Sequence, residues 1–267
     1  MINGINEPMM GLKLAISGKG GVGKSTFAAM FAHFAVQDGW RVLAIDADPA
    51  ANLAACLGMS ADERRRIVPL AERRALIEER TGAKVKQYGQ IFKLNPEVAD
   101  IAAKESAQFR NIHLLVLGAI ERGGSGCACP ESVILKALLT DVILFKDDCV
   151  IMDLEAGLEH LGRATAKGVD LMLVIVEPGS RAVETANMIK RMAGEIGISR
   201  LAIIGNKIVN ADDEEFLKNA FRDSRYLGSL LYDDTIRRAD RESLPLIDIA
   251  PPALRQSFQT LWQQIIS

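Results

Sequence analysis

The sequence predicts an α/β fold in which a mostly parallel β-sheet is flanked by helices on both faces. Short apolar runs typical of buried strands alternate with longer stretches of helical periodicity, the order expected of a parallel sheet. A glycine-rich loop joins the first strand to the first helix. Hydrophobic residues make up 49% of the 267 residues, which is enough to bury a sizeable core.

Each predicted strand is a short apolar run. These runs are Leu12–Ser17, Val42–Asp46, Ile112–Leu117, Val150–Leu154, Leu171–Val176, Leu201–Gly205 and Tyr226–Leu231. Helical patterns follow most of the strands and also close the chain. They cover Thr26–Val36, Ser132–Phe145, Leu158–Gly168, Ala182–Ile196, Glu214–Phe221, Asp234–Arg241 and Pro252–Ile265.

The chain is predicted to form one domain. Residues 1–11 are expected to be a flexible N-terminal extension, and residues 12–267 a single domain that contains the glycine-rich loop. The charged segment near 60–108 interrupts the alternation of strands and helices, although Pro69–Thr81 has helical periodicity. We therefore interpret this segment as an insertion at the rim of the sheet.

Composition narrows the possible partners and the location. A net charge of −2 argues against a strongly basic surface for nucleic acid. No apolar run reaches the roughly 18 residues that span a bilayer, so no membrane partner is expected. The N-terminus lacks the basic start and apolar core of a secretory signal. The chain is thus expected to be cytoplasmic, where cysteines more often bind metals or are buried than form disulfides.

The glycine-rich loop is predicted to bind the phosphates of ATP or ADP. It consists of Gly18, Lys19, Gly20, Gly21, Val22, Gly23, Lys24 and Ser25, and Thr26 opens the helix. Glycines let backbone N–H groups surround a polyphosphate, and the helix N-terminus adds a positive dipole. Lys24 is expected to contact the β- and γ-phosphates and the Ser25 hydroxyl to ligate Mg²⁺.

Three aspartates are predicted to converge on this loop, because each lies near the end of a strand. Asp46 and Asp48 end the second strand, and Asp153 ends the run at Val150–Leu154. The carboxyl ends of parallel strands line the ligand crevice, which makes Asp153 a candidate carboxylate behind Mg²⁺. Helix capping and turn formation are the alternative for Asp46 and Asp48.

Cys127 and Cys129 form a second candidate site, in a glycine-rich loop. Two thiolates alone leave a tetrahedral metal site half filled, but a symmetric dimer would supply four. The alternative is a pair of unconnected loop cysteines. Cys56 and Cys149 lie in apolar stretches, so we expect them to be small buried hydrophobes.

The loop has a second lysine, Lys19, before Gly20 and Gly21. In this it resembles the deviant Walker A motif of the MinD/ParA/nitrogenase-iron-protein class of P-loop ATPases. The resemblance implies a homodimer in which Lys19 contacts the partner's nucleotide while Lys24 acts in cis. It also implies that Asp48 orients the attacking water. The remaining implied roles are those of Asp153 near Mg²⁺, Asn52 beside the phosphates, and Asn206 and Lys207 at the adenine.

Nearly the whole chain resembles the CooC-type ATPases that deliver nickel during carbon monoxide dehydrogenase maturation. The resemblance rests on segments 124–130, 152–160 and 175–178, which include both cysteines and His160. It implies an ATPase whose dimer holds a metal between the cysteine pairs and releases it to a client nickel enzyme after ATP hydrolysis. Tetrahedral thiolates suit Zn²⁺ whereas the resemblance implies Ni²⁺, so both metals remain candidates.

Two other functions are compatible with the loop. A nitrogenase-iron-protein-like reductase would place a second cluster cysteine in segment 154–157, which has none. A MinD/ParA-type positioning ATPase that binds membranes would end in a basic amphipathic helix. Arg255 is the only charged residue of Pro252–Ser267, which favours a packing helix instead.

Overall fold

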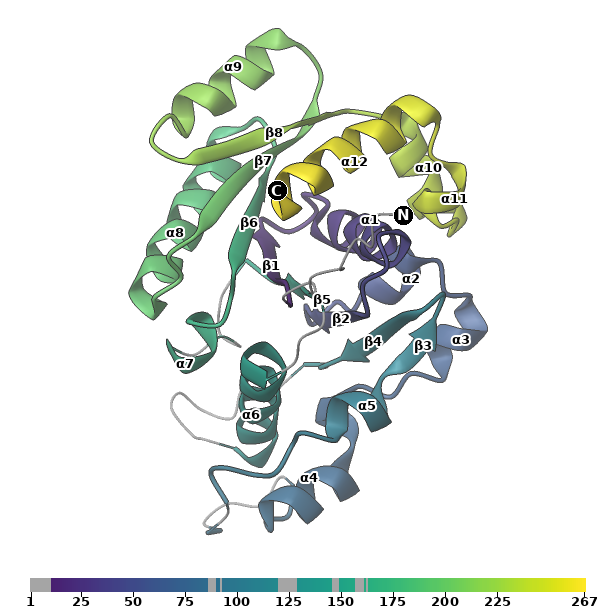
Figure 1. Cartoon of the computed structure of the whole chain (residues 1–267), viewed down its shortest axis with the longest axis vertical. Helices are drawn as coiled ribbons and strands as arrows, with labels where there is room; N and C mark the ends of the chain where they lie inside the picture. Colours follow the sequence, from purple (N-terminus) through teal and green to yellow (C-terminus); the bar gives the residue numbers. More distant parts are fainter. Residues whose placement is uncertain are drawn as a thin grey trace, which may run out of the picture.

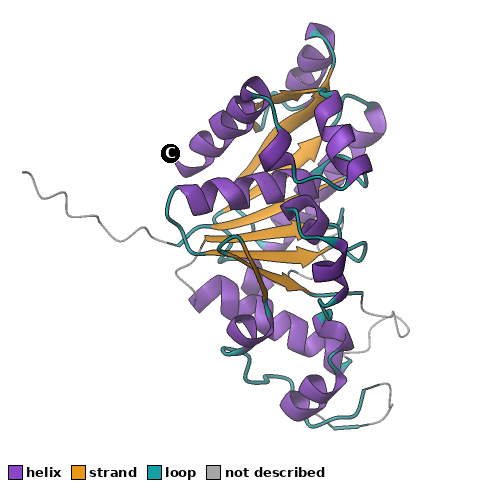
Figure 2. Cartoon of the chain, turned by 90° about the vertical axis from the view of Figure 1, so that its right-hand side faces the viewer, coloured by secondary structure: helices purple, strands orange, loops and turns teal. Residues whose placement is uncertain are grey.

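The computed structural model describes residues 11–85, 90–91, 93–119, 129–145, 149–156, 161 and 163–267. An eight-stranded sheet forms its centre, with helices on both faces (Figures 1 and 2). Its strands are β1 (Lys13–Gly18), β2 (Val42–Ala47), β3 (Ala107–Phe109), β4 (Ile112–Val116), β5 (Cys149–Leu154), β6 (Leu171–Val176), β7 (Leu201–Ile208) and β8 (Arg225–Leu231). The mostly parallel α/β fold predicted from the sequence is confirmed.

The helices connect and cover these strands. They are α1 (Lys24–Gln37), α2 (Leu53–Leu57), α3 (Ala61–Arg65), α4 (Arg74–Thr81), α5 (Ile101–Glu105), α6 (Pro130–Phe145), α7 (Arg163–Ala166), α8 (Ser180–Ile196), α9 (Ala211–Ala220), α10 (Asp234–Glu242), α11 (Leu246–Ile249) and α12 (Pro252–Ile266). A short 3₁₀ turn at Leu70–Glu72 precedes α4, so the helical pattern predicted at Pro69–Thr81 is two elements. None of the helices in the described part of the chain has the length and apolarity that a bilayer crossing requires.

The strand order is β3-β4-β2-β5-β1-β6-β7-β8. All paired strands run parallel except β3 and β4, which form an antiparallel pair at one edge. The sequence did not predict β3, because its three residues are too few to show periodicity. The segment predicted to be a rim insertion holds α3, α4 and α5 along the same edge of the molecule (Figure 1).

Successive side chains along each strand point to opposite faces of the sheet, so each face has its own hydrophobic core. On β1, Leu14 and Ile16 face the core under α1 and α12, whereas Ala15 faces the core under α6 and α8. Helix α12 packs with its apolar side on α1: the Phe258 ring lies 5.0 Å from that of Phe27. Strand β1 and helix α1 are thereby held from both sides, which fixes the loop between them.

Candidate functional site

The predicted site lies where the carboxyl ends of the central strands meet. Strand β1 leads into the glycine-rich loop, β2 and β5 end near the acidic residues, and β7 carries Asn206 and Lys207. Parallel strands bring these ends to one edge of the sheet, although the residues are far apart in sequence. The predicted residues at this edge therefore come together in the structure.

At two positions of the loop a side chain larger than that of glycine would collide with neighbouring atoms. A Cβ at Gly18 would lie 2.5 Å from the Ile175 carbonyl oxygen, and φ at this residue is +154°. A Cβ at Gly23 would lie 2.7 Å from Asn206 Nδ2, at φ +104°. By contrast, nothing lies within 4 Å of the Cβ position at Gly20. The loop is thus packed tightly against β6 and β7, while its tip remains open.

We expect Gly18→Ala to lower the free energy of unfolding by about 1–3 kcal/mol, because it combines backbone strain with a clash against a carbonyl. Gly20→Ala is the matched control, since its Cβ meets no atom. Urea denaturation of the nucleotide-free proteins measures both. Equal midpoints for the two variants would show that the packing of Gly18 on β6 does not constrain the loop.

Lys24 and Asp48 face each other across the phosphate site. Lys24 is the first residue of α1 and is only 6% exposed, and its Nζ lies 3.5 Å from Asp48 Oδ2. The other carboxylate oxygen of Asp48 accepts the Ala50 N–H at 2.9 Å, which holds the turn after β2. The buried amine of Lys24 and the carboxylate of Asp48, which the turn holds in position, therefore face the same part of the site.

Asp46 supports the turn after β2 and the start of α2. Its Oδ2 accepts the Leu53 N–H at 2.9 Å and its Oδ1 accepts the Asp48 N–H at 3.2 Å. Burial nevertheless raises the pKa of Asp46 to about 6. Both oxygens are engaged by the backbone, so the geometry favours turn formation, the alternative weighed from the sequence, over direct contact with a nucleotide.

Asp153 is fully buried beside Asp46, its partner in the register of β2 and β5. Among the described residues, none forms a hydrogen bond with either of its carboxylate oxygens. Burial raises its pKa to about 7, and the nearby Ser25 side chain and Lys24 offset only part of this effect. A buried carboxylate with two unpartnered oxygens close to a serine hydroxyl fits the needs of Mg²⁺, which prefers oxygen ligands.

The end of β7 holds the loop through two side chains. Asn206 Nδ2 donates to the Val22 carbonyl at 2.7 Å, and Lys207 Nζ donates to the Gly21 carbonyl at 2.8 Å. Lys207 Nζ also lies 3.1 Å from Glu177 Oε2, and Lys19 Nζ lies 3.2 Å from Glu177 Oε1. Glu177 thus joins the two lysines, a role that the sequence did not reveal.

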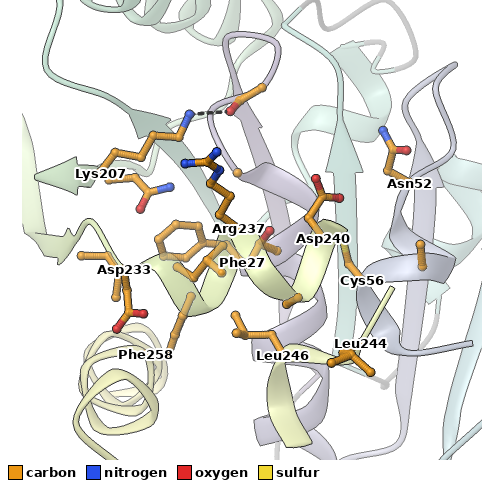
Figure 3. Close-up of a pocket in the computed structure, with 18 of the residues that line it drawn as sticks. Phe27, Asn52, Cys56, Lys207, Asp233, Arg237, Asp240, Leu244, Leu246 and Phe258 are labelled. Atoms are coloured by element: carbon orange, nitrogen blue, oxygen red, sulfur yellow. Dashed lines mark hydrogen bonds between the residues drawn. The ribbon is translucent and has the colours of Figure 1, made fainter. Parts of the chain in front are cut away.

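A cavity of about 480 Å³ opens beside the loop, between α2, β7 and α10 (Figure 3). Gly21, Gly23, Thr26, Asn52, Asn206 and Lys207 line it. Asp233, Arg237 and Asp240 also line the cavity, and Arg237 extends from α10 toward Lys207. The sequence did not single out these three residues, although their position after strand β8, at the same edge of the sheet, was an available signal.

The second candidate site is only partly described. Cys127 lies outside the described residues, as does His160. Cys129 lies immediately before α6, and its Sγ accepts the Ser132 N–H at 3.3 Å. Partial burial raises the pKa of its thiol. Among described residues, no group of three or more His, Cys, Asp or Glu side chains could hold a metal ion.

The remaining cysteines behave as small apolar side chains. Cys149 is buried in β5, and Cys56 lies on α2 at the wall of the cavity. Burial raises the pKa of the Cys56 thiol to about 12, so it stays protonated at neutral pH. Neither residue is therefore a candidate for metal binding.

Comparison with known proteins gives consistent matches over most of the chain. A family model described as the CobQ/CobB/MinD/ParA nucleotide binding domain matches residues 13–246. The chain is 40% identical to the carbon monoxide dehydrogenase accessory protein CooC of Rhodospirillum rubrum, over 90% of this chain and 91% of that protein. It is 43% identical to an uncharacterised ATP-binding protein of Methanocaldococcus jannaschii, over 88% of this chain and 91% of that protein.

Solved structures show the same fold at low identity. The MinD cell division protein of Aquifex aeolicus is 16% identical with a TM-score of 0.64, over 95% of this chain and 97% of that chain. A ParA family ATPase from Chlorobium tepidum is 17% identical with a TM-score of 0.67, over 96% of this chain and 98% of that chain. At this identity, both comparisons concern the fold alone.

Proposed function

The chain belongs to the CobQ/CobB/MinD/ParA nucleotide-binding family and is an ATPase of that class, and from this premise we propose that it is a CooC-like maturation factor. In this proposal, ATP binding joins two copies of the chain, and the dimer carries a metal ion to a client nickel enzyme. The relative named as an accessory protein of carbon monoxide dehydrogenase indicates an enzyme of that kind as the client.

The observation that carries the nucleotide part of the proposal is the buried carboxylate of Asp153 at the base of the loop, which has no hydrogen-bond partner in the part of the chain that the structure describes. Burying a carboxylate without hydrogen bonds makes folding less favourable, and folded proteins typically retain such a group where it binds a ligand. Asp153 and the Ser25 hydroxyl are the residues that would hold Mg²⁺. When bound, this ion would neutralise the negative charge that develops on the phosphates.

The chain's own groups divide the work of hydrolysis. Backbone N–H groups of the loop and the N-terminus of α1 bind the β- and γ-phosphates, and Lys24 adds a buried positive charge. Asp48, held by Ala50 and facing Lys24, orients the attacking water. Asn206 and Lys207 place the adenine beside the loop, where Asn206 retains an amide oxygen to accept from its amino group.

Lys19 gives the dimer its dependence on ATP. It lies at the tip of the loop with a side chain that is 40% exposed, unlike the buried Lys24. An exposed lysine beside the phosphates can contact the nucleotide of a second copy, and a two-fold axis makes this exchange reciprocal. Dimer formation then removes both nucleotides from water, which strengthens each charge interaction.

We expect Lys19→Ala to abolish ATP-dependent dimerisation, because each subunit loses the cation that it gives to its partner's phosphates. Light scattering with a non-hydrolysable ATP analogue should find wild type at twice the monomer mass and the variant at the monomer mass. Lys218→Ala, which removes an exposed lysine of α9, is the control and should dimerise normally. A Lys19→Ala protein that dimerises like wild type would refute the role of this lysine in trans.

The metal is the cargo of the proposed cycle. Cys127 and Cys129 of each chain would provide four thiolates at the dimer axis, an arrangement that binds Zn²⁺ or Ni²⁺. Hydrolysis of ATP separates the subunits and halves the number of thiolates around the metal, which frees it for the client. Nickel is the proposed cargo because the client indicated by the CooC relative is a carbon monoxide dehydrogenase.

A further inference from the structure

Glu177 connects the glycine-rich loop to the end of β7. It is the first residue after β6, and β6 lies between β1 and β7 in the sheet. Its carboxylate therefore lies between Lys19, which follows β1, and Lys207, which is near the end of β7. Lys19 Nζ lies 3.2 Å from Oε1 and Lys207 Nζ lies 3.1 Å from Oε2, so one carboxylate pairs with two lysines.

The position of this carboxylate is fixed by the backbone. Pro178 follows Glu177 and restricts it to an extended conformation. The preceding strand is in close contact with the loop, because no side chain fits between Gly18 and the Ile175 carbonyl. The two lysines also lower the pKa of the Glu177 carboxyl, although its partial burial acts in the opposite direction. Glu177 is thus ionised at neutral pH and already in place before any ligand binds.

The two lysines differ in how firmly they are held. Lys207 Nζ has a second contact, with the Gly21 carbonyl at 2.8 Å, and its residue adopts φ +58°. Within the described part of the chain, the Lys19 amine contacts only the Glu177 carboxylate. If Lys19 leaves, Glu177 keeps the positive charge of Lys207 beside it. The carboxylate can therefore release Lys19 without being left unpaired.

We propose that Glu177 regulates the ATPase by holding Lys19 within its own subunit until a second subunit is present. This inference rests on the proposed role of Lys19 in trans. The Glu177 carboxylate beside Lys19 Nζ would repel the phosphates of a partner's nucleotide, so we expect dimer formation to break the Lys19–Glu177 ion pair. Glu177 is in this sense a positioning residue, and it sets the ATP and protein concentrations at which dimers form.

Glu177→Gln tests the proposal, because it keeps the shape of the side chain and removes its charge. The lost pair is partly exposed, so dimerisation with an ATP analogue should occur at about two- to fivefold lower protein concentration than in wild type. Glu195→Gln makes the same substitution on an exposed residue at the far end of α8 and should match wild type. Unchanged or weaker dimerisation of Glu177→Gln would overturn the proposal.

A second readout does not depend on dimers. Acetylation of Lys19 by acetic anhydride, followed by mass spectrometry on dilute nucleotide-free protein, should be about two- to fivefold faster in Glu177→Gln than in wild type. Equal rates would show that the ion pair does not hold the lysine in solution and would also overturn the proposal. Failure of the trans role itself is distinguishable, since Lys19→Ala would then dimerise like wild type.

Discussion

Asp153→Asn is expected to stabilise the nucleotide-free protein at pH 8 while it lowers ATP hydrolysis. Asp153 is buried, no described residue forms a hydrogen bond with it, and burial raises its pKa to about 7. At pH 8 the Asp153 carboxylate is charged and buried in the folded protein, whereas water solvates it in the unfolded chain. Replacing this charge by a neutral amide should raise the free energy of unfolding by about 2 kcal/mol, with part of the gain lost to the unpaired amide.

The raised pKa of Asp153 also affects how the stability of wild type depends on pH. The folded pKa values of Asp153 and Asp46, about 7 and about 6, lie above the ordinary value of an aspartate. The folded state therefore binds these protons more tightly, and their contribution to stability falls as pH rises from about 4 to about 7. The pKa of Asp248 is lowered beside Arg110, so this carboxyl contributes in the opposite direction, below that window.

Thermal unfolding at pH 5 and pH 8, without Mg²⁺ or nucleotide, measures these effects. Wild type should lose stability between the two pH values, and Asp153→Asn should lose less. ATP hydrolysis by the variant should fall by about 10- to 100-fold, because the site loses a carboxylate next to the metal. Asp223→Asn, on an exposed turn, is the control and should change neither property. A variant less stable than wild type at pH 8 would contradict the cost assigned to this charge.

Joint replacement of Cys127 and Cys129 by alanine is expected to remove the transported metal completely. Thiolates are the ligands that would bind Ni²⁺ or Zn²⁺ in the proposed site, and the described residues include no group of three or more His, Cys, Asp or Glu side chains that could replace them. Metal analysis after dialysis in the presence of a non-hydrolysable ATP analogue should find about one ion per two wild-type chains, as a site on a two-fold axis requires, and none in the variant.

The nucleotide site should remain intact in the cysteine variant, since Cys129 does not line the cavity beside the loop. Its affinity for an ADP analogue should therefore match that of wild type. Cys149→Ala, in the buried strand β5, is the matched control and should retain the metal. A Cys127→Ala/Cys129→Ala protein with full metal content would place the metal elsewhere.

Local patterns were sufficient to predict much of the fold. Strands β1, β2, β5 and β6 are continuous apolar runs bounded by polar residues, and their predicted limits agree with the structure to within one residue. The fold class and the CooC-type resemblance are both confirmed. The strand, the loop and the helix α1 form one contiguous signal for the fold, and segments 124–130, 152–160 and 175–178 carried the resemblance. The convergence of Asp46, Asp48 and Asp153 followed from the geometry of parallel strands.

Features that depend on distant contacts could not be predicted. The Lys19–Glu177 pair joins residues 158 positions apart, and only the strand order brings them together. The backbone N–H groups of Asp48 and Leu53 that bind the Asp46 carboxylate likewise depend on the folded turn after β2, so the sequence could not decide between its two predicted roles. Arg237 reaches the cavity from α10, whose polar sequence alone resembles a solvated surface helix.

The central claim is that ATP and metal are bound by the same dimer, and molar mass and metal content measured on one sample test it most directly. With nickel and a non-hydrolysable ATP analogue, light scattering coupled to metal analysis should find nickel only in the species of twice the monomer mass, at about one ion per two chains. Nickel bound stoichiometrically to the monomer, or an ATP-bound dimer that takes up no nickel, would contradict the account.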